Sequence, residues 1–170
     1  MSASVLVDTS FLISLVDEHR PHHSIATQYY RLALEQKAPL YLSAIVASEF
    51  AIKQPITDLP LRQFRILPFN IPHAIRAAEL WRLIERDDGD NRSVVRDDMK
   101  LLAQAAKESI PIVLTEDAKT LHKYCDRLRH PRRDSGADGS VGGRIRSERS
   151  ARRWAARVEF YRFSNVAGLQ

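Results

Sequence analysis

Three short apolar runs, separated by stretches with helical spacing, constrain the fold of this chain most. Val5–Val7, Leu40–Leu42 and Ile112–Leu114 have the length of buried strands, and Val158–Phe163 alternates in type as a further strand does. A strand is also expected around Ile66. Apolar spacing and capping residues predict helices that begin after Thr9 or Ser10 and then at about 21–35, 44–53, 72–85, 97–109 and 118–128. Such alternation predicts an α/β fold, a parallel sheet with helices on both faces.

Positive charge is concentrated near the C-terminus. Residues 129–154 hold eight arginines and three acids, which account for the whole net charge of +5, so the rest of the chain is formally neutral. This segment is also rich in Gly and Ser and poor in core-forming residues. We therefore expect one domain over 1–128, a flexible insertion over 129–154, and the last strand and C-terminus of the same domain over 155–170. The arginines could contact RNA or an acidic partner, or could line a solvated loop.

The cysteine count and the lengths of the apolar runs indicate in which cellular compartment the protein is expected. Cys125 is the single cysteine, so no intrachain disulfide is possible. No apolar run approaches the roughly 20 residues that a membrane-spanning helix needs. We expect a cytoplasmic protein with no membrane partner.

Two acids follow predicted strands. Asp8 comes directly after Val7, and Asp117 lies three residues beyond Leu114. Ligands bind outside the carboxyl ends of strands in open parallel sheets, so both acids are candidates for a shared crevice. Each of them, considered alone, could equally be a turn or helix-capping residue.

Two further acids lie on predicted helices. Glu49 has Ile45, Val46 and Ile52 as neighbours on its helix, which places a carboxylate on an apolar stripe. It needs a cation, a hydrogen-bond donor or water there, and a salt bridge or a solvent-reaching position is the alternative.

Helical geometry separates two neighbouring aspartates. At 100° per residue Asp98 shares the face of Leu101 and Leu102, whereas Asp97 turns toward Lys100. We therefore expect Asp98 to point with the core-facing stripe. If the helix begins at residue 97, the alternative is that either acid only interacts favourably with the positive end of the helix dipole.

These four acids, if they converge, repel one another strongly without a counter-ion. Mg²⁺ and Mn²⁺ prefer oxygen ligands and would meet that need. Such a site suits phosphodiester hydrolysis, because the ion lowers the pKa of the attacking water and stabilises charge on the phosphate.

Four segments resemble the motifs of the PIN-domain nucleases, in the order of that family, and are most similar to the VapC-type toxins of bacterial toxin–antitoxin pairs. They are Val-Leu-Val-Asp-Thr-Ser-Phe-Leu (5–12), Leu-Ser-Ala-Ile-Val-Ala-Ser-Glu-Phe (42–50), Asp-Asp-Met-Lys-Leu-Leu-Ala-Gln-Ala-Ala (97–106) and Ile-Val-Leu-Thr-Glu-Asp (112–117). The resemblance covers about residues 3–128. It implies a three-layer α/β/α sandwich with a central, mostly parallel sheet. The insertion over 129–154 departs from the compact family pattern.

The same resemblance implies the roles of individual residues. Catalysis is expected from Asp8, Glu49, Asp98 and Asp117. Asp8 and Asp98 would bind Mg²⁺ or Mn²⁺, and Glu49 and Asp117 would do so directly or through water. Supporting roles fall on Thr9, Ser10 and Thr115.

The resemblance also implies a function. By this resemblance we expect an endoribonuclease that acts on single-stranded or structured RNA. We also expect it to be the toxin of a pair with a small antitoxin protein, and to form a homodimer. Two alternatives stay open. One is a catalytically inactive module of this fold that binds RNA or protein. The other is a DNA- or flap-directed nuclease, because carboxylate–metal chemistry does not distinguish RNA from DNA.

Overall fold

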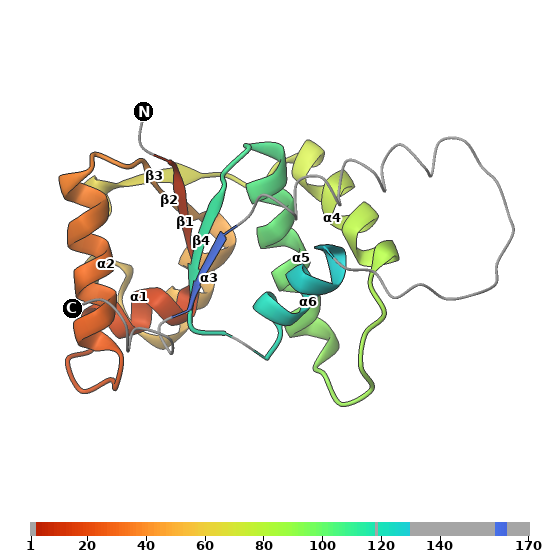
Figure 1. Cartoon of the computed structure of the whole chain (residues 1–170), viewed down its shortest axis with the longest axis horizontal. Coiled ribbons are helices and arrows are strands. Elements are labelled where there is room, and N and C mark those ends of the chain that lie inside the picture. Colours follow the sequence, from red (N-terminus) through yellow and green to blue (C-terminus); the bar gives the residue numbers. More distant parts are fainter. Residues whose placement is uncertain (1–2, 118, 130–158, 163–170) are drawn as a thin grey trace, which may run out of the picture.

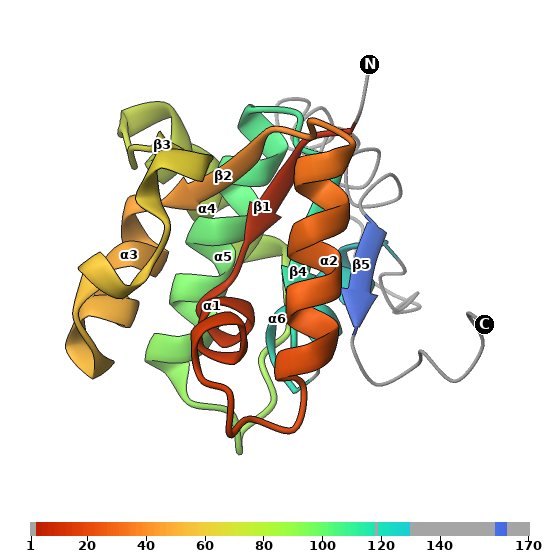
Figure 2. The same cartoon turned by 90° about the vertical axis from the view of Figure 1, so that its left-hand side faces the viewer.

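The computed structural model describes residues 3–117, 119–129 and 159–162. In this part of the chain five strands form one sheet in the order β3-β2-β1-β4-β5, and each neighbouring pair is parallel. Figure 2 shows β3 and β5 at opposite edges of the sheet. The strands are β1 (Val5–Val7), β2 (Leu40–Ser43), β3 (Phe64–Leu67), β4 (Ile112–Thr115) and β5 (Glu159–Arg162). The predicted parallel sheet is confirmed.

Helices cover both faces of this sheet. Figure 1 shows α1 and α2 on one side and α4, α5 and α6 on the other, which makes the three-layer sandwich that was predicted. The helices are α1 (Thr9–Val16), α2 (His23–Glu35), α3 (Ala44–Lys53), α4 (Ile71–Leu83), α5 (Arg92–Lys107) and α6 (Leu121–Arg129), with 3-10 turns η1 (Ile56–Asp58) and η2 (Leu61–Gln63). None of these described helices is long and apolar enough to cross a membrane.

The central strands lie in the core because helices shield them from both sides. Leu6, Leu42 and Val113 are fully buried on three adjacent strands. Phe11 packs onto the sheet from α1, and Leu102 does so from α5. The near-continuous apolar composition of the strands follows from this two-sided burial.

The first helix is capped by Asp8, a capping role that the sequence left open as an alternative for this residue. Asp8 is the N-cap of α1 and accepts the backbone N–H of Ser10 at 3.4 Å, so the prediction that Thr9 or Ser10 caps this helix was wrong. The reason is that Thr9 already has helical geometry, and its side chain reaches across to another helix. Ser43 caps α3, whose bounds of Ala44–Lys53 agree with the helix predicted at 44–53.

Helix α5 begins five residues earlier than predicted. Asn91 caps it by accepting the backbone N–H of Ser93 at 2.9 Å, and Val95 in the next turn is fully buried. Asp98 is therefore the seventh residue of the helix, and the first-turn alternative based on the helix dipole no longer applies. Helix α6 begins later than expected, at Leu121. The carboxylate of Asp117 accepts the backbone N–H groups of Lys119 and Thr120, which form a turn before the helix.

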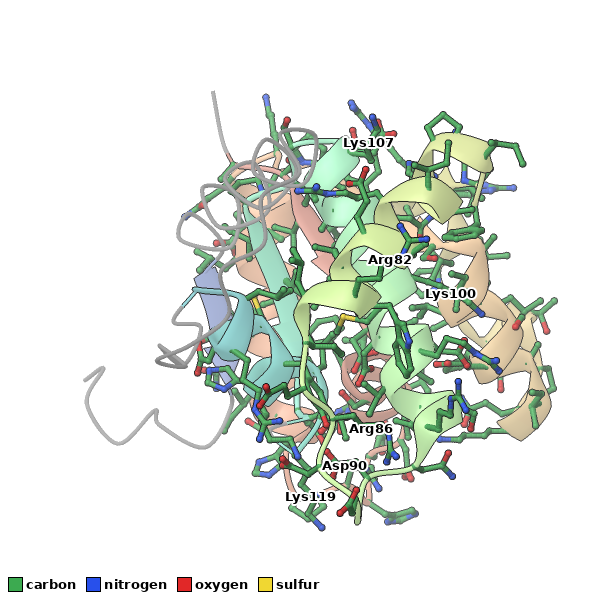
Figure 3. The ribbon with its side chains drawn as sticks, turned by 90° about the vertical axis from the view of Figure 1, so that its right-hand side faces the viewer. Arg82, Arg86, Asp90, Lys100, Lys107 and Lys119 are labelled. Atoms are coloured by element: carbon green, nitrogen blue, oxygen red, sulfur yellow. The ribbon has the colours of Figure 1, made fainter. Side chains whose placement is uncertain are left out.

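A polar network holds the connection between α4 and α5 against α6. The buried Tyr124 donates its hydroxyl to Asp90 at 2.6 Å and accepts the backbone N–H of Asp87 at 3.1 Å. Lys123 pairs with both aspartates, and Arg127 pairs with Asp87. Arg86, Asp90 and Lys119 lie at the same end of the molecule in Figure 3. The network thus links α6 to the segment that precedes α5.

The order of the strands reverses direction at β1. The chain passes from β1 outward to β2 and β3, and then crosses to β4 on the other side of β1. Ligand sites of open parallel sheets lie at such a reversal, outside the carboxyl ends of the strands. Those ends of β1 and β4 face downward in Figure 1, as does the N-terminal end of α5. The predicted insertion over 129–154 lies outside the described residues, apart from Arg129, which ends α6.

Candidate active site

Asp8 lies at the carboxyl end of β1, and two hydroxyl groups hold its carboxylate. Ser10 and Thr115 donate to Asp8 Oδ2 at 2.7 and 2.8 Å. Each hydroxyl also accepts a backbone N–H from the segment after β4, Ser10 from Glu116 and Thr115 from Asp117. The two supporting residues therefore join the ends of β1 and β4 and fix the orientation of Asp8.

Glu49 reaches the same region from α3. Its Oε2 accepts the hydroxyl proton of the buried Thr9 at 2.5 Å. Burial raises the pKa of Glu49, the Thr9 hydrogen bond offsets part of that rise, and the charges of Asp8 and Asp97 add to it. Thr9 therefore supports Glu49 rather than capping its own helix.

The surroundings of Glu49 differ in part from the expected apolar stripe. Val46 is buried, but Ile52 is 84% exposed, so the stripe does not continue past Glu49. Ile52 lies in the last turn of α3, which ends at Lys53. Glu49 consequently lies at the border of the core and is itself partly buried.

Asp98 is the most perturbed acid of the group. It points with the buried Leu101 and Leu102, and its Oδ2 is buried with no hydrogen-bond partner among the described residues. Burial raises the pKa of Asp98 to about 8, and the charges of Asp8, Asp117 and Glu49 contribute.

The aspartate that precedes it has different surroundings. Asp97 is one-third exposed and binds Lys100 at 2.6 Å. Asp97 and Asp98 thus have the orientations that helical geometry predicted.

Asp117 has both carboxylate oxygens engaged by its own turn. Oδ1 accepts the backbone N–H groups of Lys119 and Thr120 at 2.8 and 2.9 Å, and Oδ2 accepts the Thr120 hydroxyl at 2.5 Å. This is the capping role that the sequence left open as an alternative. Its charge nevertheless acts on Asp98.

The structure brings the four predicted acids, from four separate segments, to the carboxyl end of the strands, where their charges act on one another. As they are placed, no three Asp, Glu, His or Cys side chains of the described residues form a group that could hold a metal ion. The unpartnered oxygen of Asp98 and the carboxylate surroundings match the hard oxygen ligands that Mg²⁺ and Mn²⁺ prefer. The donor chemistry thus fits such an ion, which would have to draw the carboxylates closer together.

Sequence reasoning missed two polar residues on the segments that carry these acids. Thr120 donates its hydroxyl to Asp117 at 2.5 Å, and no feature of its sequence surroundings distinguishes it. Gln104 is fully buried, accepts the Ser43 hydroxyl at 2.5 Å and donates to the carbonyls of Leu67 and Pro68. It links α5, which carries Asp98, to the cap of α3. Helical spacing places Gln104 on the polar flank with Asp97 and Lys100, so its burial could not be predicted from the sequence.

A family model described as PIN domain matches residues 5–126. The chain belongs to the PIN domain family. Nucleases of this family are typically metal-dependent hydrolases, and all four predicted acids lie within the matched range.

Relatives of this PIN domain carry VapC names. Ribonuclease VapC1 of Aquifex aeolicus (strain VF5) is 25% identical over 144 residues, which cover 74% of this chain and 96% of that protein. The crystal structure of Mycobacterium tuberculosis VapC20, described as a sarcin-ricin loop cleaving toxin, has a TM-score of 0.51 at 20% identity, covering 68% of this chain and 92% of that one. VapBC2 from Rickettsia felis, solved with a promoter DNA fragment, has a TM-score of 0.50 at 14% identity, covering 70% and 91%. These two structures support the fold.

Proposed function

We propose that this PIN domain is a metal-dependent endoribonuclease and the toxin of a toxin–antitoxin pair. The observation that carries the proposal is the buried, unpartnered Oδ2 of Asp98 among the charges of three other acids. A structural carboxylate in the core would have hydrogen-bond donors or a cation beside it. The distant relationship to Ribonuclease VapC1 supports RNA as the substrate class.

The residues of this chain have separate tasks in the proposed reaction. Asp8 and Asp98 would hold Mg²⁺ or Mn²⁺, with Glu49 binding directly or through water. Asp117, whose oxygens are engaged, would act through water and by its charge. When bound, the ion would activate the attacking water and stabilise charge on the scissile phosphate. Ser10, Thr115 and Thr9 orient the carboxylates.

The proposal extends to partners and to the rest of the chain. We propose a cytoplasmic protein that acts on single-stranded or structured RNA, pairs with a small antitoxin and forms a homodimer. The names of the VapC relatives support the antitoxin. The parallel pairing of β5 with β4 supports assigning the C-terminal segment to the same domain.

The test is to map the ends of cleavage products. Single-stranded RNA should be cut with Mg²⁺ or Mn²⁺ but not with EDTA. Because water rather than the 2′-hydroxyl attacks, products should carry 5′-phosphate and 3′-hydroxyl ends. Asp8→Asn and Asp98→Asn should lower the rate by orders of magnitude, whereas Asp97→Asn is the matched control and should cut normally.

Each alternative mechanism or function predicts a different outcome of this cleavage assay. Cleavage that survives EDTA and leaves 2′,3′-cyclic phosphates would exclude the metal mechanism. Cleavage of DNA but not RNA would point to a DNA- or flap-directed nuclease. RNA or protein binding without any cleavage would point to the inactive binding module.

A further inference from the structure

Glu116 joins an exposed arginine to the acids of the candidate site. Its backbone N–H donates at 2.8 Å to the Ser10 hydroxyl, which donates to Asp8 at 2.7 Å. Its carboxylate contacts Arg20, in the connection between α1 and α2, at 3.5 Å between Oε2 and Nη2. Figure 1 shows this connection at the same end of the molecule as the carboxyl end of β4. Arg20 therefore lies beside the acids, linked to Asp8 through two residues.

The contact between Arg20 and Glu116 is looser than an ion pair that serves stability. Glu116 is 14% exposed, and its Oε1 is buried with no hydrogen-bond partner among the described residues. By contrast, Arg127 contacts both carboxylate oxygens of Asp87, at 2.8 and 2.7 Å. A buried oxygen that lacks a donor costs stability, so the placement of Glu116 calls for another explanation.

The guanidinium of Arg20 is free to bind something else. Its side chain is 42% exposed, and a guanidinium has five N–H donors, whereas this one makes a single contact of 3.5 Å within the described part of the chain. Its planar group can donate two N–H groups to one phosphate, a geometry that lysine does not offer.

RNA needs such a cation at this place. A phosphodiester that approaches Asp8, Glu49, Asp98 and Asp117 meets four carboxyl groups, whose negative charge repels it. A positive side chain at the edge of the acids offsets that repulsion and attracts the RNA backbone.

We propose that Arg20 is a substrate-binding residue that contacts an RNA phosphate next to the scissile one, and that Glu116 is the positioning residue that holds its guanidinium beside the acids. This inference rests on the proposed function and names the residue of this chain that meets the RNA backbone. A purely structural pair makes a different prediction, because its loss would change stability and leave the affinity for RNA unaltered.

The experiment compares four variants of the full chain. Arg20→Ala removes the cation, and Arg20→Lys keeps its charge. Arg20→Ala combined with Glu116→Gln removes both charges of the pair, so it preserves the net charge and leaves no unpaired Glu116. Arg31→Ala is the matched control, because Arg31 is an exposed arginine in the second half of α2, which leads away from the site toward the start of β2.

Three measurements are made on each variant. Affinity for a labelled single-stranded oligoribonucleotide is measured by fluorescence anisotropy in EDTA at several salt concentrations. The values of kcat and KM are measured for RNA cleavage with Mn²⁺. Urea unfolding shows whether each variant is folded.

The expected effect follows from the release of counterions. Each phosphate contact with a single strand adds about 0.7 to the slope of log affinity against log salt, which amounts to about fivefold in affinity at 0.1 M salt. Arg20→Ala and the double variant should bind RNA about fivefold more weakly, with that decrease in slope, and KM should rise about fivefold with little change in kcat. Arg20→Lys should keep the wild-type slope, and Arg31→Ala should match the wild type throughout.

Three results would contradict the proposal. Wild-type affinity and salt slope in folded Arg20→Ala would overturn this inference alone. An equal loss in Arg31→Ala, or recovery in the double variant, would also overturn it, because net charge or an unpaired Glu116 would then explain the loss. A wild-type protein that neither binds nor cleaves RNA would overturn the proposed function together with it.

Discussion

Replacing Asp98 by Asn should change how the stability of the metal-free protein depends on pH. The pKa of Asp98 is about 8 in the folded protein, against 3.8 for an ordinary aspartate. Since the folded-state value is the higher one, the folded protein holds this proton more tightly than the unfolded chain does. The resulting stability is fully present below about pH 3.8 and is lost as the pH rises through about 8.

The magnitude follows from the pKa difference. Each pH unit over which only the folded state retains the proton is worth about 1.4 kcal/mol. Between about pH 6 and pH 9 the wild-type protein should lose on the order of 2–3 kcal/mol from this group. Asn has nearly the same shape and no charge, so Asp98→Asn should lack this loss. Other titrating groups are common to both proteins and largely cancel in the difference.

The assay is urea unfolding in EDTA at several pH values for wild type, Asp98→Asn and Asp97→Asn. The stability of Asp98→Asn relative to wild type should rise by that amount from about pH 6 to pH 9. Asp97→Asn should run parallel to wild type, because Asp97 is one-third exposed and paired with Lys100. Parallel profiles for Asp98→Asn and wild type would refute the reasoning.

Two further predictions concern the scaffold. Gln104→Ala should cost about 2–4 kcal/mol in urea unfolding, because it leaves the Ser43 hydroxyl and two backbone carbonyls without their buried partner; an unchanged free energy of unfolding would contradict the role given to Gln104. Tyr124→Phe should cost about 1–2 kcal/mol by removing the hydroxyl that contacts Asp90 and Asp87, and a melting temperature equal to that of wild type would count against that network.

The sequence predicted features that depend on local repetition. The strands were predictable because two-sided burial demands continuous apolar runs, as in Val5–Val7 and Ile112–Leu114. The orientation of Asp98 followed from the 100° spacing of helical residues and survived an error in the start of α5. The family motifs selected the acids because metal sites of this kind depend on residue type and order.

Tertiary contacts decided the rest. The residue that caps a helix is the one whose side chain accepts a free backbone N–H of the first turn. In α1 this residue is Asp8 rather than Thr9 or Ser10, and Thr9 binds Glu49 instead. The Asp117 carboxylate is engaged by its own turn, but its charge acts on Asp98 only because the segment before α6 lies near α5 in the folded chain. The raised pKa of Asp98 is likewise a property of the folded molecule, because burial and the other carboxylates come from separate elements. The order of residues in the sequence does not reveal how close these side chains come to one another in the folded protein.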